Sequence, residues 1–300
     1  MIRGCFVVGL KQVDAFTDSA FKGNPAAVCL LEEEKDELWL QAVATEFNIS
    51  QTCFLTRIAS DSASSNPQFG LRWFTPVAEL KLCGSGTLAA SHFLFNSGLV
   101  DADVIEFMTL SGILTAKRVP DAKISISAPL ANGNECHGFS VELTFPAHPL
   151  SDYDCPGNLT QSPSLSSIST LEIKKTPYDD LFVVLHSAKA VSEYQPQFDE
   201  IQKLPARGLI ITAVAPSNSG FDFYSRFFSP KLAIKEDPVC GSAHCALAPY
   251  WSQKLGNTEL VAYQVLSLSL PLHFVTHLHT NTRTIDTQAT DDICKLTFMR

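Results

Sequence analysis

Cys83-Gly84-Ser85-Gly86-Thr87 in the first half of this 300-residue chain is matched by Cys240-Gly241-Ser242-Ala243-His244 in the second half. The first segment follows Phe74-Thr75-Pro76 and the second follows Phe228-Ser229-Pro230, so the likeness extends beyond the Cys-Gly-Ser tripeptide itself. Each segment also opens a run of small and apolar residues that is typical of a buried helix. The sequence therefore predicts two halves of similar architecture, in which several strands surround one apolar helix that begins at a Cys-Gly-Ser.

The length and composition fit a chain of two domains. With 45% hydrophobic and 18% charged residues, the 300 residues suffice for one large core or for two domains of roughly 150 residues each. We expect an N-terminal domain of residues 1–130 and a C-terminal domain of residues 139–300, separated by an Asn- and Gly-rich stretch at residues 131–138. The acidic run Glu32-Glu33-Glu34 predicts the start of a surface helix that extends to Phe47.

The charge and hydropathy patterns exclude several classes of partner. The net charge is -9 and no run of Lys or Arg exceeds two residues, which argues against a nucleic-acid partner. No apolar segment reaches the roughly 20 residues that span a bilayer. The N-terminus leaves no room for a signal peptide with its cleavage site. We therefore expect a cytoplasmic protein without a membrane partner, acting on a small molecule.

The nine cysteines do not form a recognisable disulfide or zinc pattern. Their number is odd, their spacing is irregular, and the chain contains no Cys-x-x-Cys. This argues against a secreted disulfide framework and against a metal site. Only Cys83 and Cys240 share a motif, so these two are the candidates for chemistry.

The two matched thiols predict acid–base chemistry on a carbon atom. A helix N-terminus presents unpaired N–H groups and about half a positive charge, which stabilises a thiolate and also binds a carboxylate. Cys83 and Cys240 could therefore act as catalytic acid and base on opposite faces of one α-carbon. The backbone of the two turns would hold the substrate carboxylate and the developing enolate-like charge. The substrate-binding residues expected there are Gly84, Ser85, Gly86, Gly241 and Ser242.

Further stretches of the chain resemble the phenazine-biosynthesis PhzF-like family, which shares its fold with diaminopimelate epimerase. These stretches occur in the family's order over about residues 12–262, and the last of them is quite specific. They are Val13-Asp14-Ala15-Phe16-Thr17, Phe21-Lys22-Gly23-Asn24-Pro25-Ala26-Ala27-Val28, Glu46-Phe47-Asn48-Ile49-Ser50-Gln51-Thr52, Arg72-Trp73-Phe74-Thr75-Pro76 with Glu79-Leu80, and Glu236-Asp237-Pro238-Val239-Cys240-Gly241-Ser242-Ala243-His244.

The resemblance implies an α+β fold of two pseudo-symmetric domains, each a curved, mostly antiparallel sheet wrapped around a central helix. The active site would lie in the cleft between the domains and would need no cofactor, whether metal, pyridoxal phosphate or nicotinamide. A homodimer is a further expectation, because dimers are common in this fold. The resemblance also adds candidate substrate contacts, although turn formation or helix capping is an alternative role for each of them. These candidates are Asn24, Asn48, Ser50 and Asp237.

The chain departs from the family at Gln51, where the PhzF-type isomerases carry a catalytic Glu. An amide exchanges no proton near neutral pH, so we expect Gln51 to contact the substrate through hydrogen bonds only. Ser85 stands where the family has a His. The pair of thiols, Cys83 and Cys240, resembles the epimerase branch of the fold instead.

Three functions remain open on the sequence. The first is an amino-acid racemase or epimerase that uses Cys83 and Cys240, with a small neutral or apolar substrate because no further charged cluster accompanies the motifs. The second is a PhzF-type isomerase of a cyclic or unsaturated acid, in which Asp237 takes over the proton transfer. The third is a catalytically silent homologue with a binding role.

The C-terminal tail is atypical after about residue 264. The family usually has a Gln-x-Ser-x-Arg-Gly-Gly turn after the second helix, whereas here Tyr263-Gln264 is followed by Val265-Leu266-Ser267 and no Arg-Gly-Gly occurs. We therefore expect a second domain that is incompletely closed.

Overall fold

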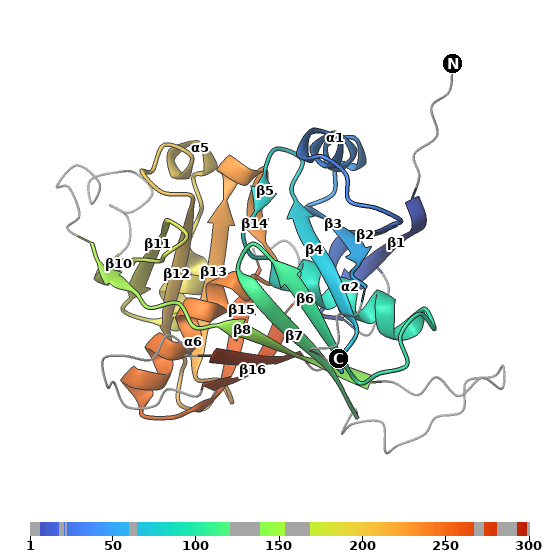
Figure 1. The fold of residues 1–300 in the computed structure, drawn as a ribbon. Coiled ribbons are helices and arrows are strands. Elements are labelled where there is room, and N and C mark those ends of the chain that lie inside the picture. Colours follow the sequence, from blue (N-terminus) through green and yellow to red (C-terminus); the bar gives the residue numbers. More distant parts are fainter. Residues whose placement is uncertain are drawn as a thin grey trace.

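The computed structural model describes residues 7–17, 21, 23–59, 65–120, 139–153, 169–266, 273–280 and 293–298. The domain boundary expected at residues 131–138 lies outside these ranges, so the position of the boundary stays a prediction. In the described part of the chain the blue-to-green half and the yellow-to-red half lie next to each other (Figure 1).

The two halves repeat one order of strands and helices. The first half contains β1 (Val7–Ala15), β2 (Asn24–Leu31), α1 (Glu37–Phe47), β3 (Gln51–Arg57), β4 (Gln68–Phe74), β5 (Glu79–Leu80), α2 (Gly84–Asn96), β6 (Val104–Thr109) and β7 (Gly112–Pro120). The second half contains β10 (Thr170–Lys175), β11 (Asp180–Leu185), α4 (Ala188–Glu193), α5 (Phe198–Ile201), β12 (Gly208–Val214), β13 (Phe223–Ser229), the 3-10 turn η1 (Pro230–Leu232), β14 (Ile234–Asp237), α6 (Gly241–Leu255), β15 (Glu259–Val265) and β16 (His273–Thr280). The remaining strands are β8 (Phe139–Pro146), β9 (Ser151–Asp152) and β17 (Ile293–Phe298).

Strand pairing follows the same repeat. In the first half β2 pairs in parallel with β3, and β4 with β6. In the second half β11 pairs in parallel with β12, and β13 with β15. The other described pairs are antiparallel, as between β1 and β2 or between β12 and β13. The predicted α+β fold of two mostly antiparallel, curved sheets is confirmed.

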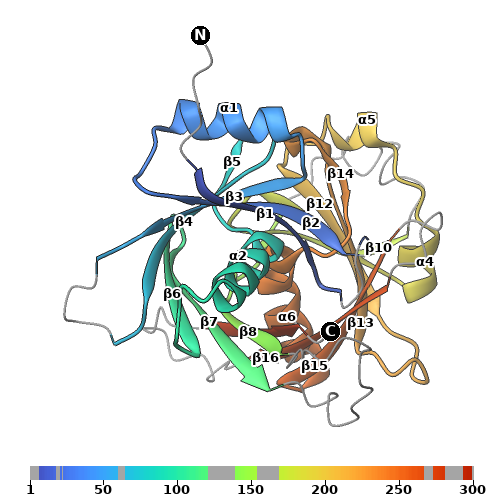
Figure 2. The ribbon, with the colours of Figure 1, turned by 90° about the vertical axis from the view of Figure 1, so that its right-hand side faces the viewer.

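One helix lies inside each sheet. Figure 2 shows α2 and α6 in contact at the centre of the molecule, with strands around them and α1, α4 and α5 on the outside. Nearly every residue of α2 is buried, which explains its uniformly small and apolar composition. Both central helices begin directly after the cysteines of the matched tripeptides, as predicted. With 15 residues, α6 is the longest described helix. No described helix is long and apolar enough to cross a membrane.

The outer helix α1 starts later than the acidic run suggested. Strand β2 continues to Leu31, and Asp36 caps the helix by accepting a hydrogen bond from the Trp39 N–H at 2.9 Å. The helix therefore begins at Glu37, and the predicted start at Glu32 is wrong. A capping carboxylate one turn downstream decided the boundary, rather than the charge of the residues before it.

The C-terminal tail closes the sheet of the second half. Strand β16 pairs with β15 from Glu259 opposite His279 to Val265 opposite His273. Strand β17 then pairs with both β16 and β8, and β8 pairs with β7 of the first half. The expectation of an incompletely closed second domain is wrong, since the ladder of hydrogen bonds runs without a break from one half into the other.

The two central helices touch at their N-termini through glycine. A methyl group on Gly84 would lie 2.6 Å from the Cα of Gly241, and one on Gly241 would lie 2.7 Å from the Cα of Gly84. Both distances are shorter than carbon atoms tolerate, and the obstacle on each side is backbone. Only glycine therefore permits this approach of the two helix ends.

Replacing Gly84 with alanine is expected to force the helix ends apart and to lower the free energy of unfolding by about 1–3 kcal/mol. Chemical denaturation followed by circular dichroism measures this change. Gly70→Ala on β4 is the matched control, because its added methyl would meet only ordinary contacts beginning at 3.7 Å. Equal stability of the two variants would contradict the proposed helix contact.

Deleting residues 267–300 removes β16 and β17 and leaves β15 without its antiparallel partner. The exposed strand edges are expected to abolish cooperative unfolding and to favour aggregation. Size-exclusion chromatography and thermal unfolding of the shortened chain test this. A monomer that unfolds at the same temperature as the full chain would show that these strands add nothing to the fold.

Candidate active site

A small cavity, partly open to solvent, lies where the N-termini of α2 and α6 meet. The space open to the centre of a water-sized sphere is about 20 Å³, enough for about one water molecule. The first half contributes Gln51, Leu80, Leu82, Cys83, Gly84 and Ser85, and the second half contributes Arg207, Phe227, Leu232, Ile234, Asp237, Cys240, Gly241 and Ser242.

The two thiols occupy equivalent positions in this cavity. Cys83 is the N-cap of α2 and Cys240 is the N-cap of α6. The Sγ atom of Cys83 lies 3.4 Å from the Oγ of Ser85, and the Sγ of Cys240 lies 3.2 Å from the Oγ of Ser242. The predicted pairing of the two motifs thus extends to the side-chain contacts.

A chain of hydrogen bonds connects Cys83 in the first half with Asp237 in the second. The Cys83 thiol donates to the Oε1 of Gln51 at 3.8 Å, and the Nε2 of Gln51 donates to the Oδ1 of Asn24 at 2.9 Å. The Nδ2 of Asn24 in turn donates to the Oδ1 of Asp237 at 2.8 Å. Asn24 is buried and is not among the residues that line the cavity, so it holds the Asp237 carboxyl from outside the cavity.

The amide of Gln51 suits these surroundings better than a carboxylate would. Its Nε2 donates to two oxygens, the Oδ1 of Asn24 and the carbonyl of Pro25, the latter at 3.3 Å. A carboxylate at this position would face both acceptors without a proton to share. Gln51 therefore acts as a donor that holds Asn24 in place.

Burial shifts the proton affinities of the acidic groups in the cavity. It raises the pKa of the Cys83 thiol to about 11, against the opposing hydrogen bonds from Ser85 and the Gly86 N–H. Burial also raises the pKa of the Cys240 thiol well above its usual value, and the nearby Asp237 adds to this shift. The thiolates expected at the helix N-termini are thus disfavoured, because loss of water outweighs the helix ends.

Asp237 behaves differently from the thiols. Burial raises the pKa of its carboxyl to about 7, while hydrogen bonds from the Val239 N–H, Cys240 and Asn24 limit the rise. Asp237 therefore titrates near neutral pH. A carboxyl in this state can both accept and return a proton.

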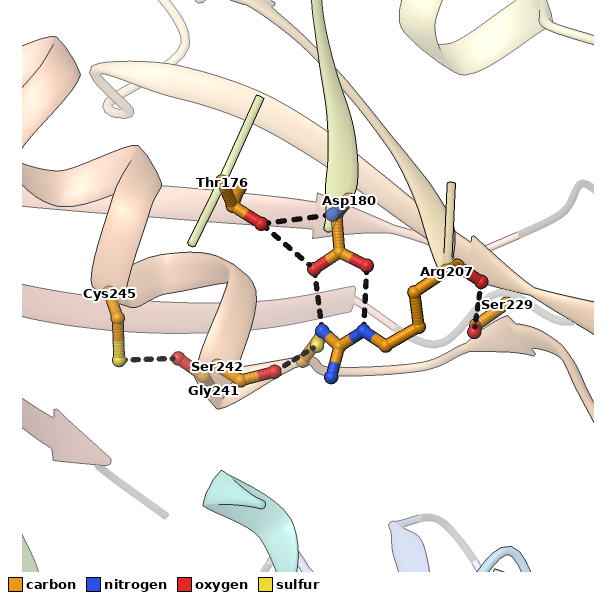
Figure 3. A network of polar contacts seen from close by, with 8 residues as sticks. Thr176, Asp180, Arg207, Ser229, Gly241, Ser242 and Cys245 are labelled. Atoms are coloured by element: carbon orange, nitrogen blue, oxygen red, sulfur yellow. Dashed lines mark hydrogen bonds and ion pairs between the residues drawn. The ribbon is translucent and has the colours of Figure 1, made fainter. Parts of the chain in front are cut away.

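Arg207 is the cavity residue that the sequence analysis missed. Its Nε donates to the Oδ1 of Asp180 at 2.8 Å and its Nη2 to the Oδ2 at 2.5 Å, as Figure 3 shows. Asp180 starts β11 opposite Gly208, the first residue of β12, so parallel pairing brings Asp180 and Arg207 together. A charged residue at the start of each of two adjacent apolar strands was the signal available in the sequence. A neutral substrate was predicted because no further charged cluster accompanied the motifs. The Arg207–Asp180 pair shows that this premise is wrong.

Some of the predicted site residues line the cavity, and the others hold the neighbouring backbone in place. Gln51, Gly84, Ser85, Asp237, Gly241 and Ser242 line the cavity together with the two thiols. Asn48 ends α1 in the left-handed conformation, at φ 51°. Ser50 donates to the carbonyl of Pro25 at 3.0 Å, and a methyl on Gly86 would lie 2.6 Å from the Trp73 ring. Asn48, Ser50 and Gly86 thus serve local structure.

The described residues contain no group of three or more His, Cys, Asp or Glu side chains placed to hold a metal ion. The rest of the cavity wall is apolar, with Leu80 and Leu82 on one side and Phe227, Leu232 and Ile234 on the other. The expectation that the chemistry needs no cofactor stays a prediction.

Comparison with known proteins identifies relatives over most of the chain. The profile of the family described as phenazine biosynthesis-like protein, PhzC-PhzF, matches residues 13–273. An uncharacterized isomerase from Halalkalibacterium halodurans is 39% identical over 254 residues, which cover 84% of this chain and 84% of the relative. The resemblance seen in the sequence motifs is confirmed.

Solved structures agree with this assignment. The crystal structure of a PhzF-family phenazine biosynthesis protein from Enterococcus faecalis has a TM-score of 0.72 at 31% identity, covering 97% of this chain and 94% of that one. A hydroxyproline epimerase from Agrobacterium vitis shares the fold alone, with a TM-score of 0.62 at 11% identity and coverage of 97% and 89%. With a matching profile, close sequence relatives and a shared fold, this chain belongs to the PhzC-PhzF family of phenazine biosynthesis-like proteins.

Proposed function

We propose that this protein is a cofactor-independent isomerase of a small unsaturated or cyclic carboxylic acid, in which Asp237 moves the proton. The observation that carries the proposal is the buried Asp237 carboxyl, with a pKa of about 7, in a cavity between two helix N-termini. The naming of a close relative as an isomerase supports the reaction class.

Asp237 is better matched to proton transfer than the thiols are. A general base works best when its pKa lies near the working pH, because it is then both available and basic enough. At pH 7 a thiol with a pKa of about 11, as in Cys83, is ionised in only about one molecule in 10⁴. Gln51, which stands where the resemblance placed a Glu, has no proton to transfer. The proton-transfer role therefore moves from the first half to the second.

The cavity surroundings support an acid as the substrate. The N-termini of α2 and α6 converge there, and the partial positive charge of each helix end favours a carboxylate and the enolate-like charge that develops on it. The apolar wall formed by Leu80, Phe227 and Ile234 suits a hydrocarbon body. A small acid with an apolar, conjugated skeleton satisfies both surfaces.

The proton balance closes with one acid–base group. The Asp237 carboxylate takes a proton from a carbon next to the conjugated system, and the electron pair of that C–H bond delocalises toward the substrate carboxylate. The protonated Asp237 then returns the same proton to another carbon of the system, and the double bond changes position. No atom is gained or lost, and no oxidation takes place.

A second candidate is an amino-acid racemase that uses Cys83 and Cys240. The equivalent Sγ–Oγ contacts at the two helix ends favour it, since racemisation needs one acid and one base on opposite faces of a carbon. This route requires one thiol to ionise. Asp237, which shares a hydrogen bond with Cys240, is the group that could accept its proton.

Proton exchange in deuterium oxide separates the candidates. The purified, reduced protein is incubated with cyclic unsaturated acids and with single-enantiomer amino acids, and loss of C–H signals is followed by NMR. Asp237→Asn is expected to slow exchange on an unsaturated acid by about 10²- to 10⁴-fold, because it removes the base while keeping the hydrogen-bonding shape. Cys83→Ser and Cys240→Ser should keep measurable exchange.

Each alternative has its own outcome in this experiment. Exchange at the α-carbon of an amino acid, with inverted product and loss in either cysteine variant, would replace the proposal by a two-thiol racemase. A folded protein that exchanges no proton on any of these acids would point to a silent homologue with a binding role.

The pH profile tests the role of Asp237 separately. The base must be ionised, so kcat/KM should rise with pH through about 7 and level off about one unit above. Asn24→Ala removes a hydrogen bond that favours the ionised carboxyl, so its rise should move to higher pH. An unchanged profile in Asp237→Asn would rule Asp237 out as the titrating group.

A further inference from the structure

We infer that Arg207 is the carboxylate-binding residue of this site, holding the substrate's anionic group against the N-terminus of α6. This inference rests on the proposed function, and it names the residue that makes an anionic group a requirement. Arg207 lines the cavity and its side chain is 19% exposed, whereas its partner Asp180 is only 4% exposed.

The geometry leaves one edge of the guanidinium unused. Asp180 accepts hydrogen bonds from the Nε and Nη2 of Arg207. In the described part of the chain the third nitrogen, Nη1, has no hydrogen-bond acceptor. Figure 3 shows this nitrogen turned away from the Asp180 carboxylate. Its two N–H groups are therefore free to donate to a ligand oxygen.

The position of the guanidinium is fixed before any ligand arrives. Thr176 donates to the Asp180 carboxylate at 3.3 Å, and the backbone N–H of Asp180 donates back to Thr176 at 3.0 Å. The Arg207 carbonyl accepts from Ser229 at 3.0 Å, and its guanidinium lies 5.6 Å from the Tyr178 ring centroid. A cation held on several sides loses little freedom when it binds an anion.

The charge of Arg207 also affects the proton affinity of the two thiols. Its charge lowers the pKa of Cys83 and of Cys240, although burial outweighs this effect in both. Arg207 lines the same cavity as the first residues of both helices. A carboxylate placed between Nη1 and the first N–H groups of α6 would be stabilised by the charged residue and by the helix end together.

The rest of the cavity permits an anion there. Asp180 is already neutralised by its pairing with Arg207, and Asp237 is the other carboxyl of the wall. Since burial raises the pKa of Asp237 to about 7, that group is mostly uncharged at pH 6. A bound carboxylate then meets the Nη1 N–H groups of a guanidinium whose charge Asp180 balances, and no unpaired anion.

Binding of a simple acid tests the inference without requiring turnover. The probe is cyclohex-1-ene-1-carboxylate, titrated into the full-length protein at pH 6 by isothermal calorimetry, with the neutral carboxamide as its counterpart. Arg207→Lys retains a cation beside Asp180 but loses the planar third nitrogen. We expect it to weaken carboxylate binding by about 10- to 100-fold, the size of a charged hydrogen bond.

Two further variants keep the result interpretable. Arg207→Met combined with Asp180→Leu removes the whole ion pair without leaving a buried charge, and it should bind the carboxylate no better than the carboxamide. Arg72→Met breaks the comparable Arg72–Glu79 pair of the first half, which lies outside the cavity lining, and should bind as the wild type does.

The inference is overturned if both Arg207 variants bind the carboxylate as tightly as the wild type, or if the wild type binds the acid and the amide equally or neither. Wild-type binding that depends on Arg207, in a protein that exchanges no proton on any acid, would leave the anion site standing and remove the proposed isomerase activity.

Discussion

The contact between Gly84 and Gly241 is the constraint on which the site depends. Because neither residue has a side chain, two buried helices of different halves meet end to end, and their N-caps Cys83 and Cys240 face one cavity. This arrangement brings two partial positive charges together, which is unfavourable until a negative group lies between them. The same contact that assembles the thiols therefore also creates a preference for an anion.

The acid–base character of the cavity depends on its closure. Asn24 and Gln51 come from the first half, whereas the Asp237 that they support comes from the second. The raised pKa of Asp237 is caused mainly by loss of water, and movement of the halves apart would restore that water. Asp237 is thus a stronger base in this cavity than a carboxyl in open water would be, and it has this basicity before any substrate binds.

The sequence was informative where the pattern was local and repeated. The two Cys-Gly-Ser segments predicted the starts of both central helices and the cavity residues beside them, because small residues at a helix N-terminus serve one purpose in both halves. The sequence analysis did not identify Arg207 as a site residue, because its position depends on the parallel pairing of β11 with β12, which brings together residues far apart in the chain. The closing strands after Val265 were missed for the same reason, since a strand edge is completed by partners that no local pattern identifies. The proton affinities of the thiols also depend on burial, and burial follows from the whole fold.

The free-energy cost of ionisation decides between Asp237 and the thiols as the first base. Removing a proton from a thiol with a pKa of about 11, as in Cys83, costs about 5 kcal/mol at pH 7, whereas ionising Asp237 costs almost nothing. The thiols, by contrast, are fully protonated and are suited to act as acids. Because Asp237 both takes and returns the proton in the proposed reaction, neither thiol has to ionise. The matched cysteines are therefore compatible with a reaction that starts at Asp237, and they need not both exchange protons with carbon.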